Sequence, residues 1–329
     1  MIKIITFLCL LSTLTFANQK PTLTIYTYDA FSAAWGAGPK IKEAFEKDCQ
    51  CTLKFVGLSS SIVALRKIQL EGKKTKADIL LGIDTNIAQI AKKTGLFLTH
   101  DLNNSNLELP FAYEDDAFAP FDYSYVAFVY DENRVKNPPS SFESLVSMPK
   151  DFKIVIQDPR SSTAGLALLL WVKSVYGDKA GAYWKRLAPY ILTITKGWSE
   201  AYGLFLKGEA DMTLSYTTSP AYHMVDENKT NIKSAAFLEG HYGQMEVAGI
   251  LKSSKNQALA RKFLAFMHSK TFAEIIPTGN WGYPVVKNIK LHEAFDKLHK
   301  PEKMLLIDAE TVAKNRKAII NEWLDAMMK

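Results

Sequence analysis

The segment 123–130 reads YSYVAFVY, an extended run of mainly apolar and aromatic residues that is typical of a buried β-strand. A second extended run, 247–251, reads VAGIL, and the residues between the two runs contain strand and helix patterns of their own. A chain that leaves one lobe, builds a second lobe and returns joins the lobes by extended segments, which makes a hinge and a cleft. We therefore predict that both runs are crossings between two lobes.

Around these crossings, strand-like and helix-like segments alternate along the chain. The first of them are a β-branched and aromatic run at 23–27, a helical pattern at 39–48 and another strand pattern at 53–56. This alternation predicts the α/β class, with two mixed sheets flanked by helices around a hinged cleft. The length of 329 residues also favours two lobes over a single core. We assign 18–124 together with 251–329 to lobe I, and 125–250 to lobe II.

The first residues predict the cellular compartment. Lys3 precedes a nearly continuous apolar stretch at 4–11, and the small residue Ala17 comes directly before polar residues. A charged start, an apolar stretch of about 7–15 residues and a small-residue exit are typical of a Sec signal peptide. A membrane anchor is the alternative, but a span needs roughly 20 apolar residues. We expect 1–17 to be a signal peptide and the mature protein to reside in the periplasm without spanning the membrane.

Charge and metal-ligand patterns exclude several classes of partner. Loss of Lys3 with the signal peptide changes the net charge from +6 to +5, and the densest basic cluster, 73–76, contains no aromatic residue. A nucleic-acid surface is therefore not expected. The six histidines are scattered without a paired spacing, so we predict no metal site. Cys49 and Cys51 could form a disulfide, although so short a ring is uncommon, and their oxidation state is left open.

Two loop-to-helix segments in lobe II carry candidate binding residues. The segment 158–165 reads DPRSSTAG and opens an apolar helix, whose free N–H groups and dipole favour an anion. The alternative is that its hydroxyls only cap the helix. The segment 196–202 reads KGWSEAY and places Trp198 just before the capping Ser199. Here the alternative is a tryptophan that closes the core beneath the loop.

Two further segments add hydroxyl groups and aromatic rings. The segment 214–223 reads LSYTTSPAYH and sets adjacent hydroxyl side chains beside two tyrosines at the end of a strand, where α/β proteins place their ligands. The segment 277–284 reads PTGNWGYP, and its prolines and glycines predict an irregular segment that presents Trp281 and Tyr283 rigidly. Ordinary packed turns are the alternative for both segments.

Together these residues predict an aromatic-walled slot whose far end is lined by hydroxyl and backbone N–H groups. Aromatic faces attract cations, and a quaternary nitrogen is a favoured guest at about 0.5–2 kcal/mol per ring. Helix N-termini attract phosphate. A ligand that combines an aromatic cation with a phosphate would match every part of this slot.

Several runs, two of them long and specific, resemble the periplasmic thiamine-binding proteins of bacterial ABC importers. The resemblance covers essentially the whole chain after the signal peptide. It implies a two-lobe, type II-like solute-binding fold without catalytic residues or a cofactor. It also implies a monomer that delivers thiamine, thiamine phosphate or thiamine diphosphate to an inner-membrane permease and its ATPase. The matching runs are 26–29, 35–36, 95–97, 120–123, 157–160, 195–207, 214–223, 239–242 and 276–281.

The resemblance also implies which residues bind the ligand. Two would hold the phosphate, three would surround the thiazolium and its tail, four form a hydroxyl-rich strand end, and one would face the pyrimidine. These are, in that order, Ser162 and Thr163; Trp198, Tyr222 and Trp281; Tyr216, Thr217, Thr218 and Ser219; and Tyr28. The loop 58–61 departs from relatives, which commonly have acidic residues followed by glycine there. Ser60 and Ser61 of this loop complete the predicted site.

Two alternatives stay open beside this interpretation. A thiamine-degrading enzyme shares the fold and uses a cysteine nucleophile in its cleft, but Cys49 and Cys51 follow the first helix, away from the strand-end loops. There is also no G-x-S-x-G motif. A binding protein for ferric ion, a polyamine or a sugar is the second alternative. Tyr216 and Tyr222, with hydroxyl residues between them, suit an organic ring better than a ferric ion.

Overall fold

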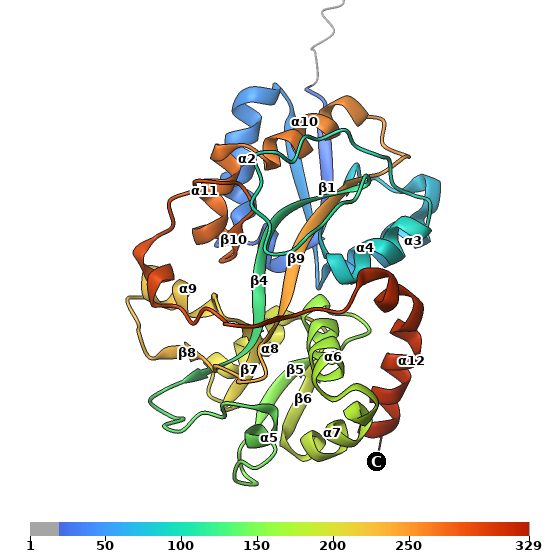
Figure 1. Cartoon of the computed structure of the whole chain (residues 1–329). Coiled ribbons are helices and arrows are strands. Elements are labelled where there is room, and N and C mark those ends of the chain that lie inside the picture. Colours follow the sequence, from blue (N-terminus) through green and yellow to red (C-terminus); the bar gives the residue numbers. More distant parts are fainter. Residues whose placement is uncertain (1–19, 329) are drawn as a thin grey trace, which may run out of the picture.

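Two strands run through both halves of the protein. The computed structural model describes residues 20–328, so the predicted signal peptide at 1–17 lies outside the described residues. Figure 1 shows two lobes one above the other, with β4 (Phe118–Asp131) and β9 (His241–Ile250) passing between them. These two strands contain nearly all of the runs 123–130 and 247–251, so both predicted crossings are strands.

Lobe I surrounds the chain's first strands. β2 (Thr52–Leu58), β1 (Thr22–Tyr28) and β3 (Ile79–Asp84) are parallel, and β9 joins β3 in the antiparallel direction. The core between sheet and helices is rich in phenylalanine. The helices of this lobe are α1 (Asp29–Ser32), α2 (Ala37–Cys49), α3 (Ser61–Glu71), α4 (Thr85–Lys93), α10 (Gln257–Met267) and α11 (Lys270–Gly279).

Lobe II repeats the α/β plan with a shorter sheet. β7 (Met212–Tyr216), β5 (Ile154–Gln157) and β6 (Ile191–Thr195) are parallel, and β8 (Ile232–Ser234) pairs with the far end of β4. The helices of this lobe are α5 (Phe142–Leu145), α6 (Thr163–Tyr176), α7 (Ala180–Leu187), α8 (Trp198–Leu206) and α9 (Ser219–Asp226). Four short 3-10 turns lie at Gly72–Lys74, Gly177–Lys179, Ala188–Tyr190 and Glu293–Lys297.

The two predicted sheets are joined through β4. This strand is 14 residues long, and it pairs antiparallel with β9 from Phe118 to Tyr125 and with β7 from Val126 to Tyr130. The strand order is therefore continuous, β2-β1-β3-β9-β4-β7-β5-β6. A single strand long enough to serve both lobes keeps its backbone hydrogen bonds across the crossing.

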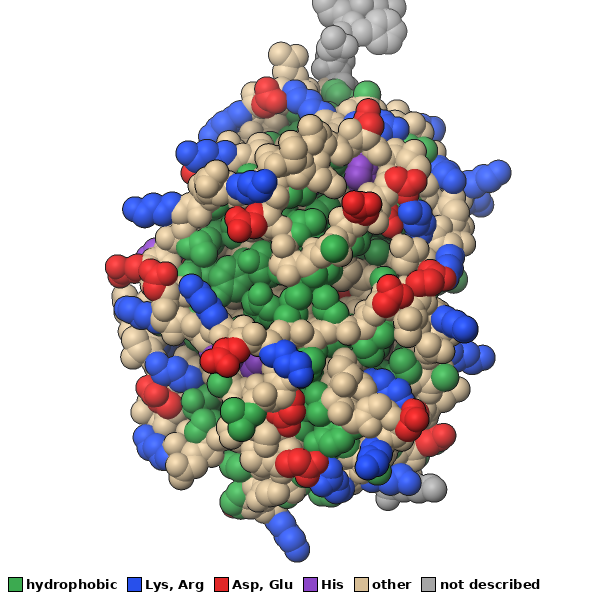
Figure 2. Space-filling view, in the orientation of Figure 1, with side chains coloured by type: hydrophobic (Ala, Val, Ile, Leu, Met, Phe, Trp, Pro, Cys, Tyr) green, Lys and Arg blue, Asp and Glu red, His purple; other side chains and the backbone are tan. Residues whose placement is uncertain are grey.

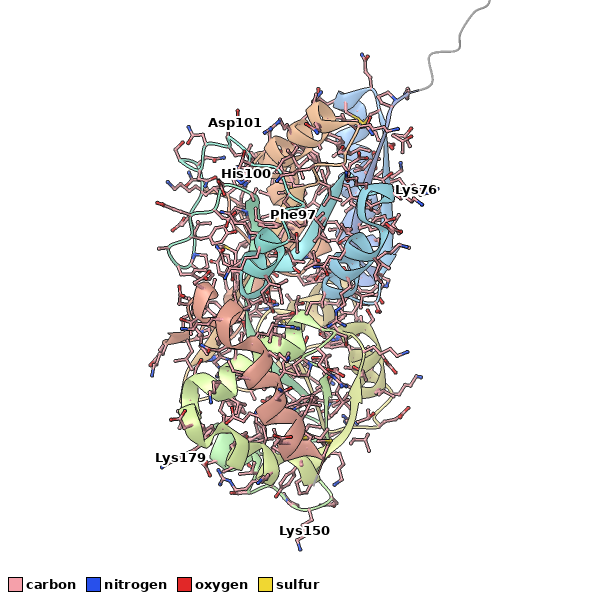
Figure 3. All side chains as sticks on the ribbon, turned by 90° about the vertical axis from the view of Figure 1, so that its right-hand side faces the viewer. Lys76, Phe97, His100, Asp101, Lys150 and Lys179 are labelled. Atoms are coloured by element: carbon pink, nitrogen blue, oxygen red, sulfur yellow. A yellow bond between two sulfur atoms is a disulfide. The ribbon has the colours of Figure 1, made fainter. Side chains whose placement is uncertain are left out.

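The C-terminal helix does not stay with lobe I. After the short strands β10 (Tyr283–Pro284) and β11 (Met304–Leu305), α12 (Ala309–Met327) packs against α7 of lobe II as well as α4 of lobe I. Trp323 of α12 packs edge-on against Trp184 of α7, and Glu322 forms an ion pair with Lys173 of α6 (3.0 Å). Figure 3 shows this helix in front of lobe II. The assignment of all of 251–329 to lobe I therefore does not describe α12, because its apolar face finds partners across the hinge.

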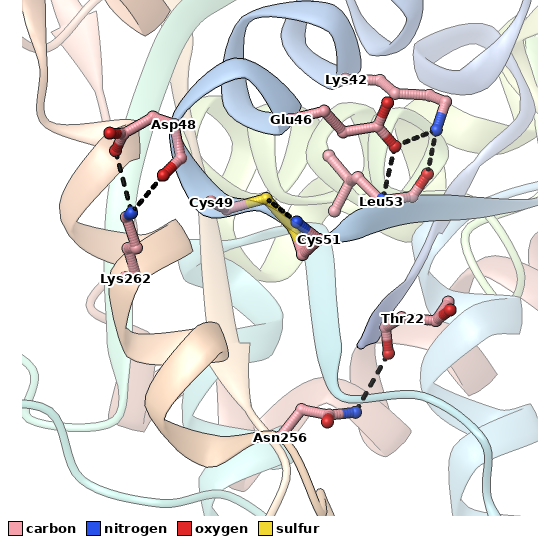
Figure 4. The surroundings of a disulfide bond; sticks show 9 residues. All are labelled: Thr22, Lys42, Glu46, Asp48, Cys49, Cys51, Leu53, Asn256 and Lys262. Carbon is pink, nitrogen blue, oxygen red and sulfur yellow. Dashed lines mark hydrogen bonds and ion pairs between the residues drawn. A yellow bond between two sulfur atoms is a disulfide. The ribbon is translucent and has the colours of Figure 1, made fainter. Parts of the chain in front are cut away.

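A disulfide closes the turn between α2 and β2. Cys49 and Cys51 form a disulfide, with their Cα atoms 5.1 Å apart. The oxidation state of these two cysteines was left open by the sequence. Figure 4 shows the same corner held by Lys262 of α10, whose Nζ lies 3.0 Å from a carboxylate oxygen of Asp48. Neither sulfur atom reaches the space between the lobes, since Cys51 is buried in the lobe I core.

Charged side chains of both signs are interspersed over the face shown in Figure 2, with apolar side chains visible at mid-height. This mixture agrees with the dispersed charge of the sequence. Within residues 20–328, no helix has the length and apolar character needed to cross a bilayer.

The two lobes touch each other across the space between them. Ser199 of lobe II donates a hydrogen bond to Asp29 of lobe I (Oγ–Oδ1 3.0 Å), and Arg66 of lobe I donates to the Arg160 carbonyl (2.8 Å). A Cβ atom placed on Gly197 would lie 2.3 Å from the Ser59 carbonyl oxygen of the opposite lobe. The backbone of Gly197 is ordinary extended chain (φ −150°), so its own fold does not require glycine. Glycine is required at this position only because the opposite lobe leaves no room for a side chain.

We predict that Gly197→Ala holds the two lobes apart without unfolding either. The new methyl group would overlap a backbone oxygen, which cannot rotate away, so the closed arrangement becomes strained. Small-angle X-ray scattering should give a larger radius of gyration than for the parent protein. The Tm should change by no more than about 4 °C, because only a helix N-cap position is altered.

Two further variants separate opening from helix capping. Gly197→Ser adds the same Cβ atom but supplies a good N-cap, so it should open the lobes equally. Gly181→Ala in α7, whose Cβ would meet only the flexible Glu322 side chain at 3.3 Å, should leave the radius of gyration unchanged. A compact Gly197→Ala protein would contradict the prediction.

Candidate ligand-binding site

A cavity of about 390 Å³ lies between the lobes and takes its walls from both. Eleven of the twelve residues predicted from the sequence line it, namely Tyr28, Ser60, Ser61, Ser162, Thr163, Trp198, Tyr216, Thr218, Ser219, Tyr222 and Trp281. Thr217 does not line it, because its side chain is fully buried behind the strand-end loop. The structure thus brings together residues separated by up to 253 positions in the chain.

Aromatic rings from both lobes form the walls. Trp198 of α8 stacks on Tyr202 (ring centroids 4.6 Å apart), and its Nε1 donates to the Ser215 hydroxyl at 2.7 Å. Tyr222 of α9 meets Trp281 edge-on at 5.5 Å, so a ring of lobe II contacts a ring of lobe I. All three rings that were predicted to surround a cation remain half-buried and face the cavity.

Trp281 is held in an unusual backbone conformation. Its φ is +58°, in the left-handed region that non-glycine residues rarely adopt, and its N–H donates to the Ile276 carbonyl at 3.0 Å. Such a conformation costs about 1–3 kcal/mol and persists where the surrounding structure over-determines it. The end of α11 therefore aims this ring at Tyr222.

The segment 277–284 is more regular than the sequence suggested. Pro277 to Gly279 form the last turn of α11, and Tyr283 to Pro284 form β10, which pairs with β4. Pro277 has no N–H to donate to the carbonyl four residues earlier, so α11 loses one backbone hydrogen bond there and ends two residues later. Tyr283 is not presented to the cavity. It stacks on Tyr123 (5.3 Å) and is only 7% exposed, so it is a core residue.

Two helix N-termini, one from each lobe, meet at the hydroxyl-rich end of the cavity. Ser60 caps α3 by accepting from the Val63 N–H (3.1 Å), and Ser162 caps α6 by accepting from the Gly165 N–H (3.3 Å). Ser60 also donates to the Ser161 carbonyl across the lobes. The helix-capping role that was considered for the segment 158–165 is therefore present, at Ser162. Ser61 is different, because its buried hydroxyl has no protein partner.

The hydroxyl-rich loop after β7 satisfies much of its own hydrogen bonding. Ser219 lies 2.7 Å from Ser215, and Thr218 lies 2.9 Å from Ser124 of β4. These contacts hold the start of α9 and place Tyr222. Two of the four predicted hydroxyl contacts thus serve to position the loop.

Sequence reasoning missed an acidic floor. Asp122 of β4 and Glu246 of β9 are direct partners in the strand ladder, and both line the cavity. Asn280 donates through Nδ2 to Asp122 (2.6 Å) and to Glu246 (3.0 Å), while the Tyr28 hydroxyl donates to Glu246 (2.8 Å). The signal was an acidic residue directly before each apolar run predicted to be a crossing, at 122 and at 246.

The electrostatic character of the cavity follows from these acids. Burial raises the pKa of Asp122 to about 7, and burial together with the charge of Asp122 raises the pKa of Glu246 well above its usual range. Asp29 also lines the cavity, and among the described residues no lysine, arginine or histidine does. A cavity with three acids and no base favours a cation.

Other chemistries find less support in the described part of the chain. No group of three or more histidine, cysteine, aspartate or glutamate side chains within 20–328 is arranged to hold a metal ion. Cys49 and Cys51 are bonded to each other outside the cavity, so neither is a free thiol beside a ligand.

Comparison with known proteins identifies the family. Residues 28–273 match the family of bacterial extracellular solute-binding proteins. The thiamine-binding periplasmic protein of Escherichia coli (strain K12) is 51% identical over 310 residues, covering 94% of each chain. That of Brucella suis biovar 1 (strain 1330) is 51% identical over 311 residues, covering 94% of this chain and 93% of the relative.

Solved structures agree with the sequence relatives. A periplasmic thiamin binding protein superposes with a TM-score of 0.92 at 52% identity, covering 94% of this chain and 96% of that one. A ferric binding protein from Campylobacter jejuni has a TM-score of 0.76 at 19% identity, covering 92% and 99%, which shows a shared fold alone. The close relatives are named as binding proteins rather than enzymes, in agreement with the predicted lack of catalysis. The chain therefore belongs to the bacterial extracellular solute-binding protein family, among its periplasmic thiamine-binding members.

Proposed function

We propose that this protein captures thiamine in the periplasm and delivers it to an ABC importer. The observation that carries the proposal is the cavity itself, whose lining within residues 20–328 combines aromatic rings from both lobes with three acids and no basic side chain. Thiamine is an aromatic cation whose thiazolium nitrogen is quaternary, so it suits rings and carboxylates together. The names of the close relatives support the same ligand.

We propose further that phosphate esters of thiamine bind with the phosphate at the hydroxyl-rich end. Two helices of 11 and 14 residues direct their N-termini there, and N–H groups at helix starts favour anions. Ser61 supports this placement, because its buried hydroxyl lacks a protein partner. The acids Asp122 and Glu246 belong to the strand floor and so leave the helix ends to the anion.

The delivery step requires partners outside this chain. We propose a monomer that docks on an inner-membrane permease, which works with its ATPase, after secretion directed by the segment 1–17. The periplasmic location of the close relatives supports this compartment. No cofactor is needed for binding and release.

A ferric site, the other solute class considered, finds no support in the cavity. Burial and the nearby charge of Glu246 raise the pKa of Tyr216 well above its usual range, which opposes the phenolate that iron requires. The likeness to ferric binding proteins is one of fold.

We predict that thiamine quenches the intrinsic tryptophan fluorescence in a saturable way. Trp198 and Trp281 both line the cavity, so a bound aromatic cation would lie beside both indoles. The dissociation constant should be nanomolar, equivalent to about 12 kcal/mol. Unchanged fluorescence at micromolar thiamine, together with tight binding of iron or a polyamine, would overturn the proposed function.

We predict that Trp281→Gly weakens thiamine binding by about 2–4 kcal/mol, the range of a contact hot spot. Glycine suits the backbone at φ +58° and removes only the ring, so the ligand-free fold should keep its stability. Trp281→Phe is the matched control, which keeps an aromatic wall and should lose less affinity. Calorimetric titration measures binding, and thermal melting measures stability. A large fall in Tm with unchanged affinity would identify Trp281 as a packing residue instead.

We predict that Thr163→Val weakens thiamine monophosphate more than thiamine. The change keeps the shape of the side chain and leaves the Ser162 cap of α6 in place, so only a hydroxyl is lost. Loss of a hydrogen bond to a charged group costs about 1.5–3 kcal/mol, roughly a tenfold to hundredfold change. Parallel calorimetric titrations of the two ligands make the comparison. Equal losses for both would place the phosphate elsewhere.

A further inference from the structure

The acids Asp122 and Glu246 are a paired feature rather than two separate groups. The β4–β9 register sets them opposite each other, and both carboxyl groups lie within hydrogen-bond distance of the same nitrogen atom of Asn280. Asn280 bridges the pair, since its single amide nitrogen donates to both carboxyl groups. Its carbonyl oxygen lies 2.8 Å from the Tyr28 hydroxyl, which is also 2.8 Å from Glu246 and has only one proton to donate between the two.

Among the described residues, the cavity lining around the pair holds acceptors and neutral donors but no lysine, arginine or histidine. Tyr28 approaches from β1, Tyr216 from β7 and Asn280 from α11, while Asp84 at the end of β3 adds a further acid nearby. The neighbouring Gln244, also on β9 and in the cavity wall, has a buried side-chain oxygen without a protein partner. Such a floor has spare acceptors, and what would satisfy them is a positively charged group or an N–H donor.

Asp122 is buried and Glu246 is partly buried, and two neighbouring carboxylates shielded from water in this way do not both ionise readily without a countercharge. One of them must keep a proton unless a cation arrives. In keeping with this, burial raises the pKa of Asp122 to about 7 and that of Glu246 above its usual range.

We propose that Asp122 and Glu246 share one proton in the ligand-free protein, and that the cationic ligand takes the place of that proton. This inference rests on the proposed function, since it assumes a ligand with the charge of thiamine. The carboxyl O–H bond breaks, the proton passes to the solvent buffer, and the electron pair stays on the carboxylate as counterion. The net charge of the site is −1 before and after binding, so the buried region never carries two uncompensated charges.

The direction of the pH dependence follows from the raised pKa. The protonated pair is favoured by the fold, so its contribution to ligand-free stability is present at low pH and is lost as pH rises through about 7. The ligand competes with the same proton. Thiamine affinity should therefore rise about tenfold per pH unit below pH 7 and level off above it.

Calorimetric titration of the full chain with thiamine in buffers of different ionisation enthalpy tests the inference. At pH 7, the dependence of the observed heat on the buffer should show release of about half to one proton per thiamine bound. Tight thiamine binding with no proton exchange, or with proton uptake, would overturn the inference and leave thiamine capture intact. Absence of thiamine binding would overturn the proposed function instead.

Neutral variants locate the proton. Asp122→Asn and Glu246→Gln keep the size of the side chain and should each reduce proton release to near zero, flatten the pH dependence and weaken thiamine by tenfold or more. At pH 8 the ligand-free variants should melt no lower than the parent, because a desolvated charge has been removed. Proton release equal to that of the parent in both variants would overturn the inference.

Asp84→Asn is the matched control. Asp84 is also a buried acid with a raised pKa, of about 6, but it caps α4 and does not line the cavity. Asparagine is an equally good N-cap, so this variant should fold and release as many protons as the parent. If neither pair variant folds, the affinity of the parent protein from pH 5.5 to 8.5 decides alone, and an affinity independent of pH overturns the inference.

Discussion

The antiparallel register of β4 against β9 is the constraint on which the rest of the molecule depends. These strands are the sheet's only members that serve both lobes among the described residues, and they place Asp122 beside Glu246 where the lobes meet. The ladder shifts register between Pro120 and Asp122, so the irregularity falls next to the acidic pair. Irregularities of this kind re-aim side chains and are frequent beside functional sites. The hinge and the floor of the cavity are thus built from the same few residues.

The site sacrifices local stability in two places. Two neighbouring acids, one buried and one half-buried, have no countercharge among the described cavity residues, and Trp281 adopts the left-handed backbone region. Both features are unfavourable in isolation. The surrounding cores compensate for them. α6, for example, has nine consecutive buried residues, from Ala164 to Val172, and packs between the sheet and α7. Features that a stable fold would avoid are therefore concentrated where the ligand chemistry needs them.

The parts of this fold that follow local rules could be predicted from the sequence. Apolar runs gave the crossings, and hydroxyl residues before an apolar helix gave the cap at Ser162. Aromatic residues in loop segments, together with the resemblance, gave the aromatic walls. The acids were missed because a single charge in a strand pattern is normally taken to face solvent, and only the tertiary pairing shows otherwise. The placement of α12 was missed for the same reason, since chain order does not tell which lobe will cover its apolar face.

The regularity of Pro277 within α11 and the bond between Cys49 and Cys51 were harder still. In both cases the sequence rule gives only the average free-energy cost of the feature, that of a proline in a helix or of a very short disulfide ring. Whether the protein tolerates that cost depends on the residues packed around the feature. Packing of α11 against α2 and the tight corner before β2 depend on residues distant in the chain. No local pattern contains that information.

The contact of Gly197 with Ser59 has a kinetic consequence. A ligand enclosed by groups from both lobes leaves after that contact opens. It therefore cannot dissociate faster than the lobes open, even when its own contacts with the cavity are weakened. Tight capture then depends on the contacts in the closed cavity, whereas rapid unloading depends on how fast the lobes open. A membrane partner that holds the two lobes apart would shorten the residence time without competing for the cavity, and would leave capture in the periplasm as efficient as before.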